Sequence, residues 1–317
     1  MPRLLAAFAL LLPFLCHSQP YPSKPVRLLV TYPAGGGADA MARLISPKLS
    51  EAIGQPVLVE NRGGASGTIA ADLVAKSAPD GYTLMLDATN HAVNPSLFPK
   101  LPYDPERAFA PVTLLALFPN ILVVTPSFPV SSVSELIAKI KAEPGKIAFA
   151  SSGNGSAQHL AGELFKAQAG LFMVHIPYRG GGPALVDVMA GQIPIYFGNM
   201  ASALPHVKSA KLKALAITGR SRSPAAPQLP TIAESGLPGY EVYEWNALFA
   251  PAGTPAEVID RMQREVARAM AATDVRERLA ALGAEPVAST PPELERFRRA
   301  EINKWAATIK RAAIKSE

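Results

Sequence analysis

Short apolar runs alternate along the chain with segments in which apolar residues recur every three or four positions. "VRLLVT" at 26–31 has the pattern of a buried strand, and 39–53 follows with the periodicity of a helix. "PVLVE", "YTLMLDA", "NILVVTP", "IPIYFGN" and "LKALAIT" supply further strands, most of them followed by helical patterns. Because strands that alternate with helices usually form parallel sheets covered on both faces, the sequence predicts an α/β fold. A stretch rich in Pro, Gly and Ser at 221–241 indicates a long connector.

Glycine-rich segments separate a strand from a helix at three places. They read "PAGGGAD" at 33–39, "SSGNGSAQH" at 151–159 and "YRGGGPA" at 178–184. Each would present unpaired N–H groups and the positive end of a helix, which suit an anion such as a carboxylate. Such a helix end contributes a few tenths to about 1 kcal/mol at an exposed position. The strand–aromatic–GGG–helix order occurs at 26–45 and again at 174–190, which predicts two lobes that face one cleft.

The first 18 residues have the pattern of a secretory signal peptide. Arg3 precedes an apolar run from Leu4 to Leu15, and small and polar residues lead to a cleavage site after Ser18. The apolar run is too short to span a bilayer, and no later run reaches the roughly 18 residues that a span requires. Cys16, the single cysteine, lies in this segment. The exported chain would therefore have neither disulfides nor thiolate metal ligands.

The charge balance is moderately basic, with a formal net charge of +6. The densest basic stretch is "ERFRRAEINKWAATIKRAAIK" near the C-terminus, which has the pattern of a solvated helix face. An exported protein rarely meets nucleic acid, so we expect no nucleic-acid partner. We expect the protein to be a monomer.

A dinucleotide site is the main competing interpretation of the first glycine segment. The fingerprint G-x-G-x-x-A and the acidic residue at the end of the next strand correspond to Gly35, Gly37, Ala40 and Glu60. Pro33 and Ala34 widen the turn, however, and Asp39 places a carboxylate where a pyrophosphate would lie. The signal peptide also directs the chain to a compartment where free nicotinamide cofactors are not expected. We therefore expect no cofactor, with this interpretation kept as an alternative.

The chain lacks recognisable catalytic or metal-binding constellations. The nucleophile elbow G-x-S-x-G does not occur, and no GK[ST] follows a glycine run. The histidines beyond the signal peptide do not have helical metal-ligand spacing: His91, His159, His175 and His206. No catalytic residue and no metal ligand is assigned, and we expect that the protein is not an enzyme.

The motifs, taken in order, resemble the Bug family. These are "YPAGGGADAMAR", "QPVLVENRGGASG", "ASSGNGSAQHLAGELF", "IPYRGGGPALVDVMAGQI" and "APAGTP", which extend over essentially the whole chain after the signal peptide. Members of this family are extracytoplasmic solute receptors associated with tripartite tricarboxylate transporters. The resemblance implies a type II periplasmic-binding-protein fold, with two α/β lobes, a cleft between them and crossing strands that join them. We expect lobe 1 to contain 19–122 plus 228–317, and lobe 2 to contain 123–227.

The resemblance also implies the ligand-binding residues. The family's P-x-G-G-x-x-D loop holds a carboxylate through backbone groups and waters, and corresponds here to Pro33, Ala34, Gly35, Gly36 and Asp39. We expect Asp39 to cap its helix and order the loop rather than contact an anion. The other expected positions are Thr89 and Asn90 in lobe 1, and Ser152, Asn154, Ser156, His159, Tyr178, Arg179, Gly180 and Gly181 in lobe 2.

Three further positions have roles that the sequence leaves open. His159 either donates to the ligand or bonds only its own loop. Asn199 stands where family members often carry aspartate, and the loss of that charge favours a plain carboxylic acid as ligand. Trp245 either roofs the pocket or belongs to the core.

The function that the resemblance implies is transport. A periplasmic receptor of this kind captures a small carboxylate between its lobes and delivers it to the membrane permease subunits. An exported ligand sensor without a dedicated permease is the alternative.

Overall fold

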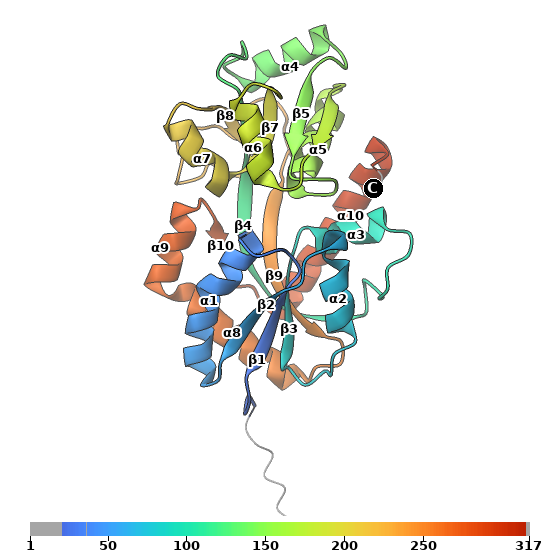
Figure 1. The fold of residues 1–317 in the computed structure, drawn as a ribbon, viewed down its shortest axis with the longest axis vertical. Coiled ribbons are helices and arrows are strands. Elements are labelled where there is room, and N and C mark those ends of the chain that lie inside the picture. The colour runs from blue at the N-terminus through green and yellow to red at the C-terminus, as the bar shows by residue number, and fades with distance from the viewer. Residues whose placement is uncertain (1–20, 36, 315–317) are drawn as a thin grey trace, which may run out of the picture.

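Two α/β lobes lie one above the other along the long axis of the molecule, and two long strands run between them (Figure 1). The structure is a computed structural model that describes residues 21–35 and 37–314. The predicted signal peptide, 1–18, and Gly36 lie outside the described residues. The strands that join the lobes are β4 (Phe109–Val124) and β9 (Tyr243–Pro251). The predicted two-lobed α/β architecture with crossing strands is therefore present.

Lobe 1 contains a mixed sheet in the order β2-β1-β3-β9-β4. Its remaining strands are β1 (Val26–Val30), β2 (Val57–Asn61), β3 (Thr83–Ala88) and β10 (Glu285–Pro286). β1 pairs in parallel with β2 and β3, whereas β9 lies antiparallel to β3 and to β4. The prediction of purely parallel sheets is wrong here, because the two strands that enter and leave lobe 2 run in opposite directions.

Helices cover both faces of this sheet. They are α1 (Gly37–Ile53), η1 (Ala65–Gly67), α2 (Thr68–Ala75), α3 (Asn90–Leu97), α8 (Ala256–Ala271), α9 (Thr273–Ala281) and α10 (Pro291–Ala312). α1 begins two residues before the predicted start and continues without interruption through Pro47. Its buried face includes Met41, Ile45 and Leu49, the side chains that the periodicity indicated.

Lobe 2 has a smaller sheet with its own helices. Its elements are α4 (Val133–Ala142), β5 (Ala148–Ser151), α5 (Ala157–Ala169), β6 (Val174–Pro177), α6 (Gly181–Met189), β7 (Ile195–Asn199), α7 (Met200–Lys208) and β8 (Lys213–Ile217). β5 pairs in parallel with β6 and β7, while the end of β4 lies antiparallel to β7 and β8. The glycine segments at 151–159 and 178–184 therefore follow adjacent parallel strands, which brings them to the same edge of the sheet.

The connector after β8 packs on lobe 2. The Ile217 N–H donates to Pro230 O at 2.9 Å, and the Ile232 N–H donates back to Ile217 O at 2.9 Å. The Tyr240 hydroxyl donates to Ala161 O in α5 at 2.7 Å. The sequence assigned everything from residue 228 onward to lobe 1. From these contacts we propose instead that the chain returns to lobe 1 at Tyr243, where β9 begins.

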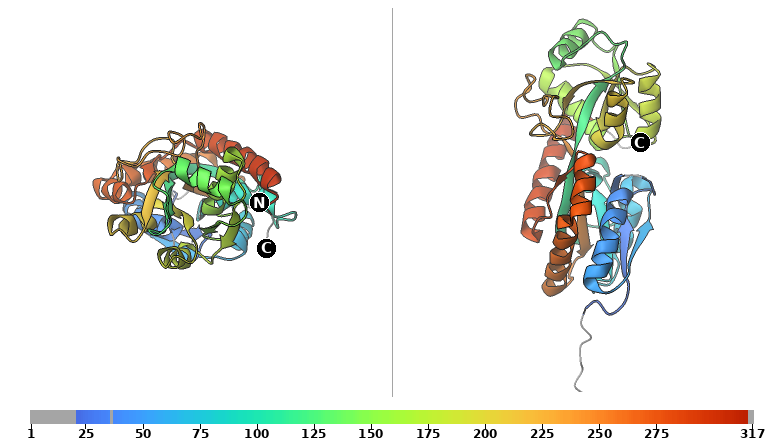
Figure 2. Two further views of the ribbon diagram at one scale, coloured as in Figure 1. Left: turned by 90° about the horizontal axis from the view of Figure 1, so that it is seen from above. Right: turned by 90° about the vertical axis from the view of Figure 1, so that its left-hand side faces the viewer.

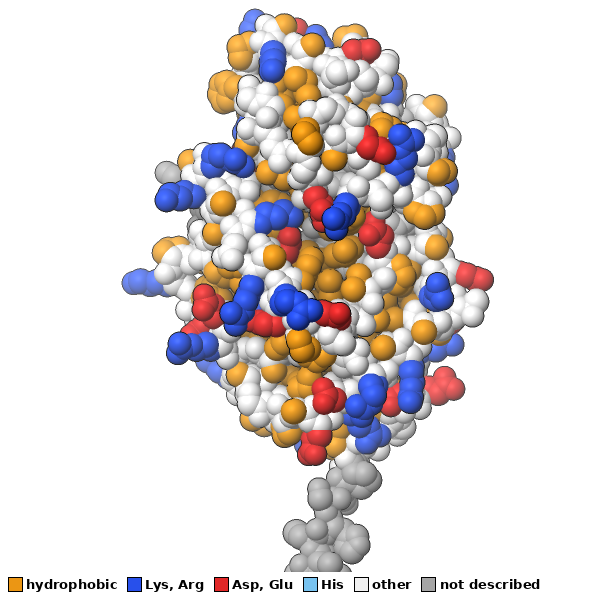
Figure 3. Space-filling view, turned by 180° about the vertical axis from the view of Figure 1, so that it is seen from behind, with side chains coloured by type: hydrophobic (Ala, Val, Ile, Leu, Met, Phe, Trp, Pro, Cys, Tyr) orange, Lys and Arg blue, Asp and Glu red, His pale blue; other side chains and the backbone are white. Residues whose placement is uncertain are grey.

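The C-terminal helix α10 packs against α3 and β4 and also against α5 of lobe 2 (Figure 2). Its exposed Arg299 is 2.6 Å from Glu295, and Lys304 is 2.9 Å from Glu301. Acidic and basic side chains are correspondingly interspersed on the back of the molecule (Figure 3). Arg299 and Lys304, which belong to the basic stretch near the C-terminus, are thus paired with acidic residues of α10 itself. None of the described helices is both long and apolar enough to cross a membrane.

Candidate ligand-binding site

The loop after β1 is ordered by a charged side chain. The Gly35 N–H donates to Asp39 Oδ2 at 2.8 Å, and Arg43 Nε contacts Asp39 Oδ1 at 2.9 Å. Arg43 in turn donates to Asn61 Oδ1 at 3.1 Å. Burial raises the pKa of the Asp39 carboxyl, but these hydrogen bonds outweigh it and hold the pKa below its usual value. Asp39 orders the loop, as the sequence indicated.

Pro33 and Ala34 in this loop are exposed, and so is Gly35. Gly35 has a φ of +85°, a left-handed conformation that side chains other than that of glycine rarely adopt. Gly63 lies against the ring of Pro33, because a Cβ added to Gly63 would be 2.9 Å from it. We name Pro33, Ala34, Gly35 and Gly37 the lobe-1 loop.

Thr89 and Asn90 begin α3, but their polar groups bond within lobe 1. Thr89 is 2% exposed, and its hydroxyl accepts the N–H of Trp245 at 3.4 Å. Asn90 Nδ2 donates to Ser66 O at 3.4 Å. Thr89 therefore contacts β9 at the start of α3, and its expected part in ligand binding stays a prediction.

Two hydroxyls and the start of α6 converge in lobe 2. Ser152 Oγ lies 3.1 Å from the Tyr196 hydroxyl. A Cβ on Gly181 would be 2.9 Å from that hydroxyl and 3.3 Å from Ser152 Oγ, so only glycine leaves this space open. Gly180 has a φ of +106°, and its N–H donates to Ser152 O at 3.3 Å. We name Ser152, Gly180, Gly181 and Tyr196 the lobe-2 corner.

Tyr196 was not predicted from the sequence. Burial, with a smaller contribution from the Glu244 carboxylate, raises the pKa of Tyr196 to about 12. The phenol therefore remains a hydrogen-bond donor at neutral pH. The strand "IPIYFGN" was recognised, but alternation along a fully buried strand does not show which side chains face a neighbouring glycine loop.

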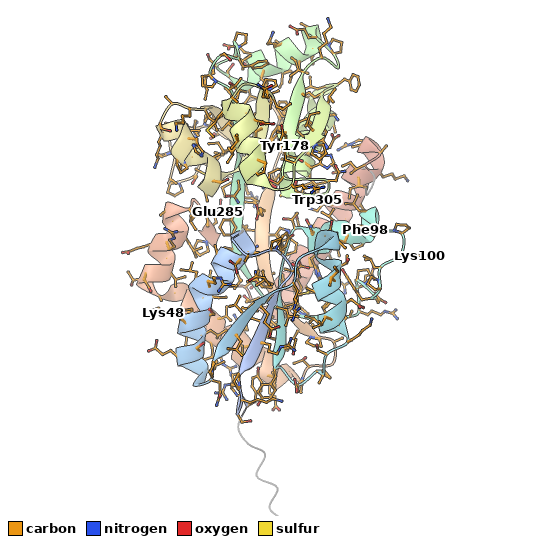
Figure 4. All side chains as sticks on the ribbon, viewed as in Figure 1. Lys48, Phe98, Lys100, Tyr178, Glu285 and Trp305 are labelled. Atoms are coloured by element: carbon orange, nitrogen blue, oxygen red, sulfur yellow. The ribbon has the colours of Figure 1, made fainter. Side chains whose placement is uncertain are left out.

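Other predicted lobe-2 residues organise their own loops. Ser156 caps α5, since its Oγ accepts the His159 N–H at 3.2 Å and donates to Gly153 O at 2.7 Å. Tyr178, which Figure 4 shows in lobe 2, donates its hydroxyl to Asp187 at 2.6 Å. Burial and Asp187 raise the pKa of Tyr178 to about 12.

Asn154 and Arg179 have accessible side chains at the ends of the same loops. Asn154 is half-buried and Arg179 is exposed. Within the described ranges, Arg179 makes no ion pair. These two side chains are available to a ligand that approaches the lobe-2 corner.

His159 bonds its own loop. It is 4% exposed, its Nδ1 accepts the Gly155 N–H at 3.1 Å, and its ring stacks on His175 at 3.7 Å. His175 Nε2 lies 2.6 Å from Ser151 Oγ. Burial and the adjacent His159 lower the pKa of His175 to about 3. Of the two roles left open by the sequence, the structure supports the structural one for His159.

Trp245 belongs to the core, and the idea that it roofs the pocket is wrong. Its side chain has 0% exposure, and its Nε1 donates to Glu301 Oε2 at 3.2 Å. Its ring meets Phe297 of α10 edge-on, with a centroid distance of 5.6 Å. Trp245 therefore fixes α10 to β9.

Next to Trp245, Glu244 places a carboxylate between the lobes. Glu244 Oε2 accepts hydrogen bonds from Gln158 Nε2 and Asn199 Nδ2, both at 3.1 Å. Its other oxygen, Oε1, would be 3.4 Å from a Cβ on Gly37 at the start of α1. Gln158 Nε2 also donates to Asn120 Oδ1 at 3.0 Å. Elements of both lobes thus converge on Glu244.

This carboxylate changes the interpretation of Asn199. Asn199 Oδ1 accepts the Ala201 N–H at 2.9 Å, so it caps α7 and its amide nitrogen points to Glu244. Asn199 itself is neutral, but Glu244 places a negative charge next to it, since Glu244 Oε2 lies 3.1 Å from its amide nitrogen. No sequence pattern marked Glu244, which stands near the start of β9 as an ordinary polar residue before the apolar run.

The structure also bears on the dinucleotide alternative. Glu60, the residue that would hold a ribose, forms a two-point ion pair with Arg27 at 2.8 and 3.0 Å. Gly35 and Gly37 of the glycine fingerprint instead belong to the lobe-1 loop that Asp39 orders, and Ala40 lies in α1.

Two open hollows occur elsewhere, on the surface of lobe 2. Each has a volume of about 350 Å³, and their walls come from α4, α7, β8 and the connector. In the part of the chain that the structure describes, none of the predicted ligand residues lines them.

Two lobes joined by crossing strands, with glycine-rich helix starts in both, define the class of periplasmic binding proteins. A family model described as tripartite tricarboxylate transporter family receptor matches residues 41–314. The chain belongs to this family of solute-binding receptors, which are not enzymes.

Individual relatives cover nearly the whole chain. Protein BugT of Bordetella pertussis is 40% identical over 93% of this chain and 91% of its own length. The structure of Rpa4515 of R. palustris with adipate has 38% identity and a TM-score of 0.85, and covers 93% of this chain and 99% of its own. MatC from Rhodopseudomonas palustris with bound malate has 35% identity and a TM-score of 0.80, and covers 91% and 100%.

Proposed function

We propose that this protein is a periplasmic receptor that captures a small carboxylate between its lobes and delivers it to the permease of a tripartite tricarboxylate transporter. In this proposal residues 1–18 are removed on export. The receptor family and the carboxylates bound by two relatives, adipate and malate, support the proposal.

The observation that carries the proposal is the convergence of glycine-rich helix starts from both lobes. Gly37 of lobe 1 approaches Glu244, which bonds Gln158 and Asn199 of lobe 2. A helix start offers N–H groups and a positive dipole end to a carboxylate. Neither lobe has the complete set of groups, so a ligand would have to bridge them.

We assign the two ends of the ligand to different groups. The backbone N–H groups of Ala34 and Gly37 in the lobe-1 loop hold one carboxylate, with Asp39 fixing the loop from behind through the Gly35 N–H. The Ser152 hydroxyl, positioned by the buried Tyr196 hydroxyl, and the backbone at Gly180 and Gly181 hold the acidic or polar group at the other end. Asn154 and Arg179 add donors at the rim, while Ser156 and Tyr178 act by shaping the loops.

Binding would be coupled to a rotation of the lobes about β4 and β9. Closure brings the lobe-1 loop and the lobe-2 corner onto the same ligand and removes its carboxylates from water. The closed form is then the one that a permease would recognise.

Calorimetry and thermal melting of residues 19–317 test the proposal. Adipate, succinate and malate are compared with the corresponding diamides and with a nicotinamide cofactor. A ligand at a thousand times its Kd stabilises the folded state by about 4 kcal/mol, which is easily measured. We expect saturable binding of at least one dicarboxylate and none of its diamide. Binding of the cofactor alone, or of no acid, would overturn the proposal.

Delivery requires a separate test. Uptake of the bound acid is measured in cells that lack the gene for this receptor, with and without a plasmid-borne copy. We expect uptake to return with the intact chain and not with Gly181→Ala. Undiminished uptake in the deletion strain would contradict the transport role.

A further inference from the structure

We propose that Glu244 makes the receptor selective for carboxylates that carry a hydroxyl or ammonium group next to a carboxyl group, and that it discriminates against the unsubstituted acids. The proposal rests on the function proposed above and names the ligand class of the same site.

The position of Glu244 supports this role. Glu244 is the second residue of β9 and the register partner of Phe118 in β4, at the junction of the lobes. It is half-buried, and Oε1 lies toward the first residue of α1. A ligand that reaches from the lobe-1 loop to the lobe-2 corner must therefore pass this carboxylate.

The side-chain amides of Gln158 and Asn199 hold the Glu244 carboxylate in place, so their donated N–H groups are not available to a ligand's carboxylate. Asn199 is fixed by its cap on α7, so its nitrogen faces Glu244. Gln158, which is 4% exposed, divides its nitrogen between Glu244 and Asn120. Both amides donate to the same oxygen, Oε2. A carboxylate has about four acceptor positions, so Oε1 retains acceptor capacity toward the side where the ligand would lie.

The consequence for a ligand follows from charge and hydrogen bonding. An unsubstituted diacid brings carboxylates near Glu244 and offers it no donor, so like charges repel without compensation. A hydroxyl or ammonium on the carbon next to a carboxyl group can donate to Oε1. An ammonium also carries the opposite charge, which strengthens that hydrogen bond. We therefore expect the order ammonium, hydroxyl, hydrogen, from tightest to weakest.

Calorimetry with matched acids of three chain lengths tests this order. The sets are succinate, malate and aspartate; glutarate, 2-hydroxyglutarate and glutamate; and adipate, 2-hydroxyadipate and 2-aminoadipate. In the wild-type protein, at the chain length that binds, we expect the best donor-bearing acid to bind at least tenfold more tightly than the unsubstituted one. Glu244→Gln keeps the shape and removes the charge, and should reduce this preference to threefold or less.

A matched control separates the local charge from the net charge. Glu241→Gln removes the same charge three residues earlier, before β9 begins, and should leave the preference unchanged. The comparison within the wild-type protein stands even if Glu244→Gln folds poorly. An unsubstituted acid that binds as tightly as its substituted partners, or a preference that persists in Glu244→Gln, would overturn the proposal. Failure of every acid to bind would instead refute the proposed function, and this inference with it.

Discussion

The lobe-1 loop and the loop that starts α5 in lobe 2 follow the same local plan, but different chemistry holds them. Asp39 orders the first through an ion pair with Arg43 and a hydrogen bond from Gly35. Ser156 and His159 order the second through hydrogen bonds to Gly153 and Gly155. One loop depends on a carboxylate and its ion pair, and the other on a serine hydroxyl and an imidazole nitrogen that accepts an N–H.

The difference predicts opposite vulnerabilities along the pH scale. The pKa of Asp39 is lowered, so its contribution is complete above the usual carboxyl pKa of about 4 and is lost as the pH falls below that value. The pKa of His175 is lowered to about 3, so its contribution begins to fade already below the usual histidine value of about 6.5. Mild acid should thus weaken lobe 2 first.

The largest expected effect comes from filling the lobe-2 corner. Gly181→Ala places a methyl group 2.9 Å from the Tyr196 hydroxyl, so the hydroxyls must move away from the ligand. Overpacking of this kind amounts to about 1–3 kcal/mol, or roughly tenfold to a hundredfold in Kd, which calorimetry measures.

Gly182→Ala is the matched control, because a Cβ there meets no atom within 4 Å. It should leave Kd unchanged and raise the melting temperature slightly through better helix propensity. Equal losses of affinity in the two variants would contradict the role of the corner.

Removal of the charged support from the lobe-1 loop should have the next largest effect. Asp39→Ala removes the acceptor for the Gly35 N–H and the partner of Arg43, and we expect a loss of about 1–2 kcal/mol in the free energy of unfolding. Urea denaturation measures this loss, and Kd should rise with it. Asp39→Asn retains an acceptor for Gly35 and should recover about half. An unchanged denaturation midpoint in both variants would show that the loop does not need this support.

The contribution of His175 to the stability of lobe 2 is tested by varying the pH. Between pH 7 and pH 5 the unfolded chain takes up a proton at residue 175 that the folded state does not, because His175 is largely buried, stacked on His159 and close to Lys166. We expect the free energy of unfolding to fall by on the order of 1–2 kcal/mol at pH 5 from this group. His175→Gln should flatten the pH dependence, whereas His206→Gln in α7 should not. An identical slope in all three proteins would exclude the mechanism.

The smallest effect is expected at the exposed end of the lobe-1 ion pair. The Arg43 side chain is 57% exposed, so Arg43→Gln should cost no more than about 0.5 kcal/mol in urea denaturation. A loss as large as that of Asp39→Ala would mean that the ion pair, and not the hydrogen bond to Gly35, orders the loop.

The sequence was most informative where a local pattern decides the structure. Alternating runs predicted the α/β lobes, because they depend on residues close in the chain. The ordering of the first loop by Asp39 was implied by the family resemblance of its motif. Trp245, Tyr196 and Glu244 could not be placed this way. Their environments are set by pairing between β4, β7 and β9, strands that lie far apart in sequence. For the same reason, the contacts of the connector with β8 and α5 could not be predicted from the sequence.

With the lobe boundary that we propose at Tyr243, the paired crossing of β4 and β9 makes lobe 2 a continuous insertion in lobe 1. Phe118 and Glu244 are register partners, so the chain enters and leaves the insertion at adjacent positions, about 5 Å apart. The segment from residue 119 to residue 242 could therefore be exchanged as one piece between relatives. In such a chimera the exchanged α5 would have to remain complementary to α10, which it contacts. Glu244 lies just outside this unit. A receptor that acquired a new lobe 2 would keep its central carboxylate while it changed the amides that hold it.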